Sequence, residues 1–126
     1  MIDIKELRIG SVVYINNIDG VFIINSIEKN SSFTGGYVCI MQFWEKSSPN
    51  NLSPIPLTKE LLLKCGFSEL DDVYENDNIE VTNIDGKFRL TYNVYEYIIA
   101  EKPIEYLHQL QNLFLDLTDR VLDVKL

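Results

Sequence analysis

The sequence predicts an α+β fold, with a small curled antiparallel sheet (SH3-like or a partial barrel), a short central helix and an amphipathic C-terminal helix. Segments rich in β-branched and aromatic residues fill the first third of the chain and the region 73–100, which is typical of strands. Leucines gather between Thr58 and Gly66, which suit the start and the stop of a short helix. Apolar residues at spacings of three and four follow Pro103, and this is the period of an amphipathic helix.

The length and composition favour one folded domain. The chain has 126 residues, of which 46% are hydrophobic, and this is enough for one sizeable core without disulfides or metal. We therefore expect a single domain over 1–126. Its parts are an N-terminal β-rich part at 1–45, a short helix at 58–66, a β-hairpin region at 73–100 and a C-terminal helix at 104–118.

The N-terminal part reads as a three-stranded sheet. Strands are expected at Val12–Ile15 and Val21–Ile27, joined by a hairpin in which Asp19-Gly20 supplies the positive φ of a tight turn. A third strand is expected from about Gly36 to Trp44. Both faces of these strands carry apolar residues, which predicts a strongly curled sheet covered by another element.

The polar, proline-bearing stretch 45–56 is expected to be a surface connection. An acidic segment then runs from Glu69 to Asp85, and it does not have the carboxylate and glycine spacing of an EF-hand calcium loop. A second hairpin is predicted at the end of this segment, with strands at 79–82 and 87–92 and with Asp85-Gly86 in the turn. The six residues 83–88 match 17–22 at five positions. Because little outside the turn matches, we favour two turns with the same favourable sequence, and a duplicated half-domain is the alternative.

Five residues near the C-terminus are candidate binding residues. Tyr95 and Tyr97 lie on one face of the expected last strand, and without nearby Arg or Lys they suit a packing ladder or a protein-contact surface better than base stacking. His108, Gln111 and Asn112 lie beside the predicted core stripe of the final helix. Their side chains suit hydrogen bonding to a partner or to the protein's own loops.

The core stripe of that helix is expected to follow the three- and four-residue spacing. It consists of Leu107, Leu110, Phe114, Leu117 and Val121. Lys102-Pro103 is expected to end the preceding strand.

Charge and composition exclude several classes of function. The formal net charge of −8 opposes direct nucleic-acid binding. The chain has neither an 18-residue apolar run nor the start of a signal peptide, so we expect no membrane insertion and a cytoplasmic location. Cys39 and Cys65 are too far apart for a zinc knuckle or a redox pair, which favours buried, reduced thiols.

The sequence offers no catalytic constellation. His108 is the only histidine, which excludes a two-histidine metal site and leaves any triad without an identifiable nucleophile. Many carboxylates are present, but their spacing singles out no acid-base pair. We expect no catalytic residue, metal or cofactor, and a protein that is not an enzyme.

Four pieces of the chain, in order, carry a family resemblance. They are Glu6-Leu7-Arg8-Ile9-Gly10, then Pro54-Ile55-Pro56-Leu57-Thr58 before a leucine-rich helix ending in Cys65-Gly66-Phe67, a tyrosine-bearing β region, and Leu107-His108-Gln109-Leu110-Gln111-Asn112-Leu113-Phe114 followed by Leu117-Thr118. This order resembles a family of small uncharacterised proteins encoded by phages, prophages and other mobile elements of gut-type bacteria. Family members often carry a glycine after the Leu-Thr pair, where this chain has Asp119. The resemblance implies a biological context and no catalytic residues.

The expected function is that of a non-enzymatic protein-interaction module of a phage or mobile element, which modulates a host or phage protein. The acidic charge, the tyrosines and the amide-rich helix surface favour it. Two alternatives stay open. One is a small-molecule binder, for instance of a signalling nucleotide, with a pocket between the curled sheet and the final helix. The other is a structural or assembly component of a particle, for which a homo-oligomer is expected.

Overall fold

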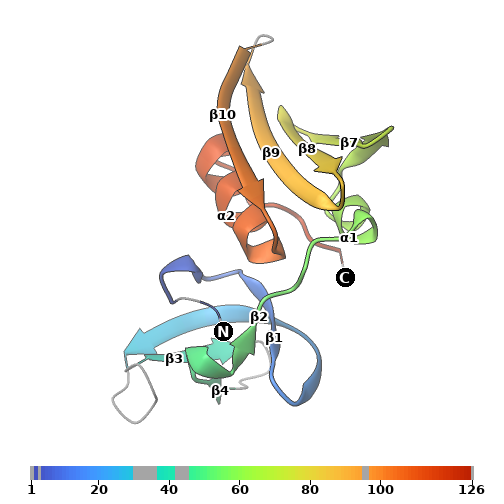
Figure 1. The fold of residues 1–126 in the computed structure, drawn as a ribbon. Coiled ribbons are helices and arrows are strands. Elements are labelled where there is room, and N and C mark those ends of the chain that lie inside the picture. Colours follow the sequence, from blue (N-terminus) through green and yellow to red (C-terminus); the bar gives the residue numbers. More distant parts are fainter. Residues whose placement is uncertain (1, 3, 30–36, 42–45, 95–96, 126) are drawn as a thin grey trace. The chain divides into compact units, whose positions relative to one another are not determined.

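The computed structural model describes residues 2, 4–29, 37–41, 46–94 and 97–125, and these fall into two compact units. Unit 1 is Met1–Ile55 and unit 2 is Pro56–Leu126 (Figure 1). Each unit has a five-stranded antiparallel sheet of its own. The single domain expected over 1–126 stays a prediction.

Unit 1 is built on a sheet with the strand order β4-β3-β2-β1-β5. Its elements in chain order are the 3-10 helix η1 (Ile4–Glu6), β1 (Val12–Ile15), β2 (Ile18–Lys29), β3 (Tyr37–Met41), β4 (Lys46–Ser47), the 3-10 helix η4 (Pro49–Asn51) and β5 (Leu52–Ser53). The long strand β2 pairs with both β1 and β3, and its register shifts once in each pairing. Such irregularities bend a strand and increase its twist, which explains why this sheet curls.

The core of unit 1 is apolar, as the strand pattern predicted. It consists of Ile2, Leu7, Val13, Ile15, Ile24, Cys39, Met41 and Leu52, with Phe22 and Ile27 packed against it. The stretch expected to be a surface connection contributes to this unit: Pro49 is buried and Leu52 has no exposed surface. That expectation was wrong, because two-residue strands and a 3-10 helix fold the stretch onto the sheet.

The first hairpin turns at a different place from the one predicted. Ile15 pairs with Ile18, so the turn is Asn16-Asn17, with Asn17 in the left-handed region at φ 66°. Gly20 lies inside β2 at φ 102°, beside the register shift against β1. The Asp-Gly pair therefore accommodates an irregularity in the strand and does not form the turn.

Unit 2 contains two helices and a sheet in which consecutive strands are neighbours, in the order β10-β9-β8-β7-β6 (Figure 1). Its elements in chain order are α1 (Lys59–Lys64), β6 (Ser68–Leu70), β7 (Val73–Asn76), β8 (Ile79–Ile84), β9 (Lys87–Val94), β10 (Tyr97–Ile104) and α2 (Leu107–Thr118).

Short polar turns join the central strands of this sheet. The β7–β8 turn is Asp77-Asn78, with φ 49° and 66°, and the β8–β9 turn is Asp85-Gly86, with φ 53° and 81°. Positive φ at both turn residues is the geometry that suits a two-residue hairpin. The second predicted hairpin is thus confirmed.

The short helix α1 agrees with its sequence signals. The Thr58 hydroxyl accepts a hydrogen bond from the Leu61 N–H at 3.1 Å, and Gly66 takes φ 84° just after the helix. At the start of α2, the Gln109 side-chain oxygen accepts from the N–H groups of Glu105 and Tyr106. Gln109 thereby satisfies two amides at the start of its own helix.

The C-terminal helix begins later than expected, at Leu107, because β10 continues through Pro103 to Ile104. The prediction that Pro103 ends the strand was wrong. β10 is an edge strand, and proline is tolerated there because its missing N–H costs no ladder bond on the open side. The helix ends at Thr118, and Asp119 takes the left-handed conformation at φ 58° that a glycine usually occupies.

The core stripe of α2 is confirmed for Leu107, Leu110 and Phe114, which are buried. Val121 lies beyond the helix and is 79% exposed, while its neighbour Leu122 is buried instead. The chain turns after Asp119, so the helical spacing no longer applies there.

The predicted fold class is confirmed: the protein is α+β, with curled antiparallel sheet, a short central helix and an amphipathic C-terminal helix. The sequence did not predict that the strands form two separate five-stranded sheets. Among the described residues, no helix has the length and apolar character needed to cross a membrane.

Candidate functional site

The sheet of unit 2 has two chemically different faces. Along β7, β8 and β9 each buried residue lies between half-buried or exposed ones, as expected for strands with one face in a core. The inner face carries Tyr74, Ile79, Val81, Leu90 and Ile104, all buried.

We define the outer face by the residues that alternate with these. They are Ser68, Leu70, Val73, Glu75, Glu80, Thr82, Ile84, Lys87, Arg89, Thr91, Glu101 and Pro103. All twelve are exposed or half-buried, so no described part of the unit covers this face.

A row of glutamates crosses the outer face. Glu75 on β7 lies directly opposite Glu80 on β8. Glu80 in turn pairs with Thr91 on β9, and Thr91 pairs with Glu101 on β10. Arg89 makes an ion pair with Glu101, whereas Glu75 and Glu80 have no ion-pair partner in the part of the chain that the structure describes. Like charges directly opposite each other destabilise a sheet, so this arrangement has a local cost.

A second row, with apolar side chains at both ends, runs beside the glutamates. Leu70, which is 77% exposed, pairs with Val73, and Val73 pairs with Thr82. Thr82 pairs with Arg89, and Arg89 with Pro103. The outer face thus combines exposed aliphatic side chains with carboxylates, a mixture found at protein interfaces.

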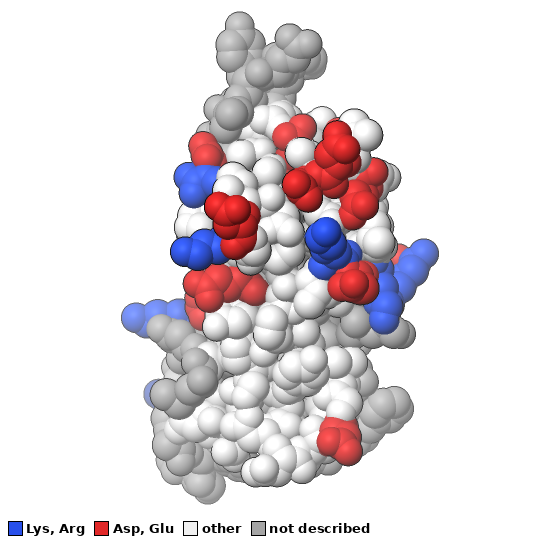
Figure 2. Space-filling view, turned by 45° about the vertical axis from the view of Figure 1, so that its right-hand side comes forward, with Lys and Arg blue, Asp and Glu red and all other residues white. Residues whose placement is uncertain are grey.

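The charge of the chain is concentrated in unit 2. Unit 2 has fourteen acidic and seven basic residues, against five and four in unit 1. Between Lys64 and Lys87 there are seven carboxylates and no lysine or arginine. Figure 2 shows carboxylates gathered on one region of the surface with few cations between them.

Removing one of the two opposed glutamates is expected to stabilise the protein. Glu75→Gln should raise the free energy of unfolding by about 0.2–1 kcal/mol at low salt, because it removes a directly opposed like charge. Denaturant melts at low and high salt measure this, and the gain should shrink at high salt. Glu28→Gln is the matched control, because Glu28 is exposed and lies opposite Val38. An equal gain in the control would attribute the effect to net charge alone.

On the inner face, Tyr74 has no exposed surface. Its hydroxyl makes no hydrogen bond of regular geometry within the described residues, although the Glu69 carboxylate lies close enough to act as a weak acceptor. This interaction with Glu69 first, then burial, then the charges of Glu69, Asp72 and Glu60 raise the pKa of Tyr74 to about 12. All three effects favour the neutral phenol.

This raised pKa predicts a loss of stability in alkali. The folded state holds the Tyr74 proton more tightly than the unfolded chain does, whose pKa is near 10.0. This contribution of Tyr74 to the free energy of unfolding is fully present below the unfolded-state pKa of 10.0, and it is lost as the pH rises through the folded-state pKa of about 12. Urea melts of wild type and Tyr74→Phe between about pH 8 and about pH 11 test it. The wild type should lose more stability than the variant above pH 10 or so; parallel curves would contradict the assignment.

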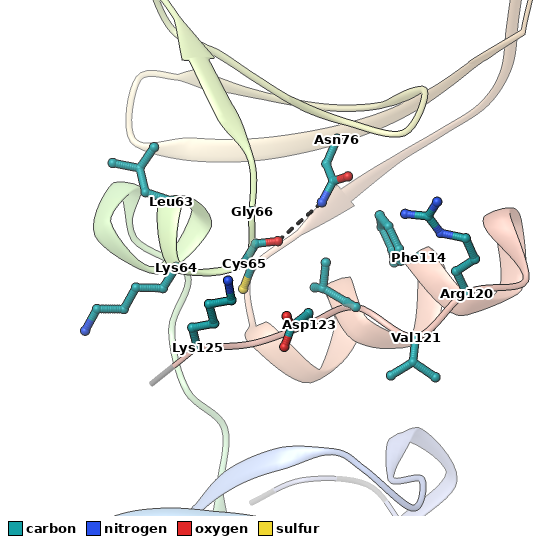
Figure 3. A pocket seen from close by; sticks show the side chains of 11 residues that line it. Leu63, Lys64, Cys65, Gly66, Asn76, Phe114, Arg120, Val121, Asp123 and Lys125 are labelled. Atoms are coloured by element: carbon teal, nitrogen blue, oxygen red, sulfur yellow. Dashed lines mark hydrogen bonds between the residues drawn. The ribbon is translucent and has the colours of Figure 1, made fainter.

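A cavity of about 420 Å³ lies in unit 2, at the end of α1 (Figure 3). Its lining comes from the end of α1, the end of β7, α2 and the C-terminal segment, with Cys65, Asn76, Phe114, Leu122 and Lys125 among the residues. The Lys125 N–H donates to the Lys64 carbonyl oxygen at 3.0 Å and attaches the C-terminal segment to α1.

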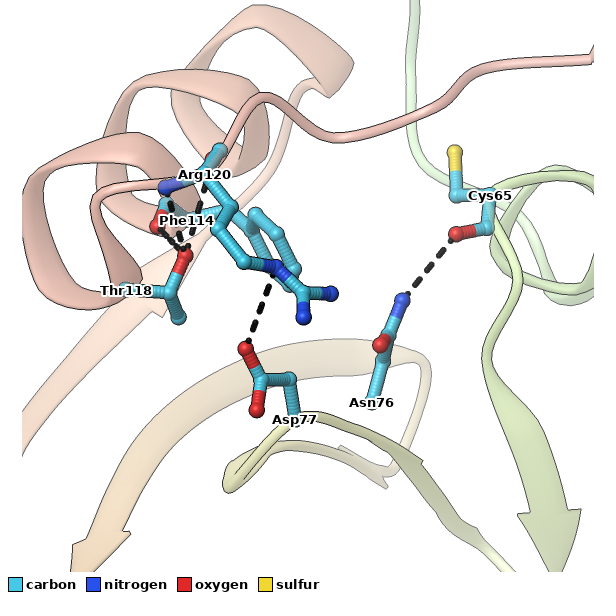
Figure 4. A network of polar contacts seen from close by, with 6 residues as sticks. All are labelled: Cys65, Asn76, Asp77, Phe114, Thr118 and Arg120. Atoms are coloured by element: carbon cyan, nitrogen blue, oxygen red, sulfur yellow. Dashed lines mark hydrogen bonds and ion pairs between the residues drawn. The ribbon is translucent and has the colours of Figure 1, made fainter.

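Polar contacts fix the walls of this cavity (Figure 4). Asn76 Nδ2 donates to the Cys65 carbonyl oxygen at 3.3 Å, and Arg120 Nε lies 3.4 Å from Asp77 Oδ2. Burial, and secondly the Asp123 carboxylate, raise the pKa of the Cys65 thiol to about 11. The thiol is therefore protonated near neutral pH and is a poor nucleophile.

The predicted site residues differ in their location and in their exposure to solvent. Tyr95 lies outside the described residues, and Tyr97 is the first residue of β10. His108 is 1% exposed, and its ring stacks on Tyr106 with centroids 6.0 Å apart, so it is not available at the surface. Gln111 and Asn112 are half-buried on α2.

Neither protein-family profiles, nor curated proteins, nor solved structures match this chain. Among the described residues, no group of three or more His, Cys, Asp or Glu side chains is placed to hold a metal ion. The outer face and the cavity at the end of α1 are two features with recognisable binding chemistry. The sequence did not predict the outer face, although the alternation in 79–84 and the run of carboxylates were signals for it. A pocket beside the final helix was left open as an alternative, but none of the lining residues of this cavity was named for it.

Proposed function

We propose that this protein is a non-enzymatic interaction module that binds a partner protein through the outer face of unit 2. In the context that the family resemblance implies, the partner is a host or phage protein that the module modulates. The observation that carries the proposal is the direct pairing of Glu75 with Glu80 on an uncovered sheet face. Two directly opposed glutamates that have no ion-pair partner among the described residues would be matched by a lysine or arginine of a partner.

The rest of the outer face supports a protein partner over a simple cation. Leu70 and Val73 offer aliphatic surface next to the glutamates, and Glu101 extends the acidic row to the edge strand. A partner surface with basic side chains around an apolar centre would match both rows. The concentration of carboxylates in unit 2 would also speed the encounter with such a partner.

The test is affinity capture from a lysate of cells that naturally express the protein, with three forms of the bait. These are the wild type, the variant Glu75→Gln/Glu80→Gln, and the control Asp19→Asn/Glu28→Gln. The control removes the same charge from exposed positions of unit 1. We expect one stoichiometric protein on the wild type and the control, and about ten-fold less on the outer-face variant. Salt should release it, because the contact is electrostatic.

Two outcomes would contradict the proposal. One is that the wild type retains nothing above the bead control. The other is that the outer-face variant retains the partner as well as the wild type does.

Small-molecule binding is a second candidate function, and the cavity at the end of α1 favours it. Mass spectrometry of molecules released by heat from the purified protein tests this function. A nucleotide is disfavoured as the ligand, because Asp123 lines the cavity and Asp77 already pairs with Arg120 of the lining.

A further inference from the structure

The cavity at the end of α1 has the size and lining of a small-ligand site. Its volume of about 420 Å³ lies within the range of about 300–1,000 Å³ common for such sites. Phe114 and Leu122, both buried, supply apolar walls, and the side chain of Asn76 supplies an amide. A ligand with an apolar body and one polar head would fit this combination of apolar walls and polar groups.

Cations are concentrated at this cavity although unit 2 is acidic. Three of the seven basic residues of unit 2 line it: Lys64, Arg120 and Lys125. In Figure 3 the Lys64 side chain extends away from the cavity, whereas the Lys125 side chain reaches toward Cys65. Within the described residues, the Lys125 ammonium makes no ion pair. It is therefore available to a ligand.

Arg120 is held in an orientation that suits an anionic head group. Its Nε lies 3.4 Å from Asp77 Oδ2, and its backbone N–H donates to Thr118 Oγ1 at 3.2 Å. The Thr118 hydroxyl in turn donates to the Phe114 carbonyl oxygen at 2.6 Å, at the end of α2. Figure 4 shows the two terminal guanidinium nitrogens on the side that faces Asn76. Asp77 thus engages one edge of the guanidinium and leaves the terminal edge for a two-oxygen group.

We infer that this cavity binds a small organic anion, with a carboxylate or phosphate head on Arg120 and an apolar body against Phe114 and Leu122. The Asp123 carboxylate in the lining opposes a second negative charge. A monocarboxylate should therefore bind more tightly than a phosphate monoester. This inference does not depend on the outer face.

The experiment is an NMR titration of the full chain with hexanoate, hexyl phosphate and hexanol as probes. The reporters are the Gly66 backbone amide and the Asn76 side-chain amide, both in the lining. Hexanoate should give saturable shifts at millimolar concentrations, and hexanol should not. Arg120→Gln should weaken hexanoate binding about ten-fold, which is ~1.4 kcal/mol. Arg89→Gln is the control, since Arg89 is on the outer face, and it should bind as the wild type does.

Lys125→Gln is a second variant, in the C-terminal segment outside the helices, and it should weaken hexanoate binding less than Arg120→Gln does, because Lys125 lies at the other end of the cavity and attracts the anion only at longer range. The inference is overturned if hexanoate and hexanol act alike, if neither anion saturates the shifts by about 10 mM, or if Arg120→Gln binds hexanoate like the wild type. Saturation by hexanoate and not by hexanol supports it, and tighter binding of hexyl phosphate than of hexanoate would contradict the preference for a single negative charge.

Discussion

Phe114→Ala is expected to destabilise unit 2 by about 3–5 kcal/mol, the usual cost of truncating a buried aromatic side chain. Phe114 is 1% exposed and packs edge-on against Phe67, with ring centroids 6.5 Å apart at an interplanar angle of 68°. Truncation would remove this contact and enlarge the neighbouring cavity, which Phe114 lines. Denaturant melts followed by circular dichroism measure the loss.

The matched control on the same helix is Gln111→Ala. Gln111 is half-buried and belongs to the polar surface of α2, so its truncation should cost well under the loss at Phe114. Equal, small losses at both positions would mean that α2 is peripheral to the core of unit 2.

Ile24→Ala is expected to cost about 2–5 kcal/mol in unit 1. Ile24 has no exposed surface and belongs to the apolar core of this unit, beside Val13, Met41 and Leu52. Its backbone also links two segments, because the Ile24 N–H donates to the Ser11 carbonyl oxygen and the Ile24 carbonyl oxygen accepts from Gly10. The backbone of Ile24 therefore joins β2 to the segment just before β1.

Hydrogen exchange combined with denaturant melts checks this prediction. Amide protection in β1, β2 and β3 should fall in Ile24→Ala. Ile23→Ala is the control one residue away, since Ile23 is 40% exposed, and it should cost much less. Similar losses for Ile23 and Ile24 would contradict the assignment of faces in β2.

Features that depend on a few neighbouring residues could be predicted from the sequence. The Thr58 cap, the Gly66 stop and the Asp85-Gly86 turn are local signals, and the structure has all three. The buried stripe Leu107, Leu110 and Phe114 follows from helical spacing alone.

Features that depend on pairing between segments could not be predicted. The same four residues, Asn-Ile-Asp-Gly, form the turn at Asp85-Gly86 but have Asp19-Gly20 inside a strand, because the register of β1 against β2 decides which residues turn. Pro103 is compatible with a strand only because β10 is at the edge of its sheet. Edge position is a property of the whole sheet and has no local signal.

The candidate site also depends on pairing between segments and could not be predicted from the sequence. Glu75 and Glu80 are five residues apart in the chain, and only the two-residue turn at Asp77-Asn78 makes them directly opposite. Glu101 joins their row through Thr91 two strands away. The cavity likewise needs Asn76, Phe114 and Lys125, which come from three separate segments.

The most direct test of the outer face is an NMR titration with a short peptide of alternating lysine and glycine. We expect shifts centred on the amides of Glu75, Glu80 and Thr91, which disappear in Glu75→Gln/Glu80→Gln and persist in Asp19→Asn/Glu28→Gln. Shifts centred instead on the turns at Asp71 and Asp85, or unchanged in the outer-face variant, would contradict it.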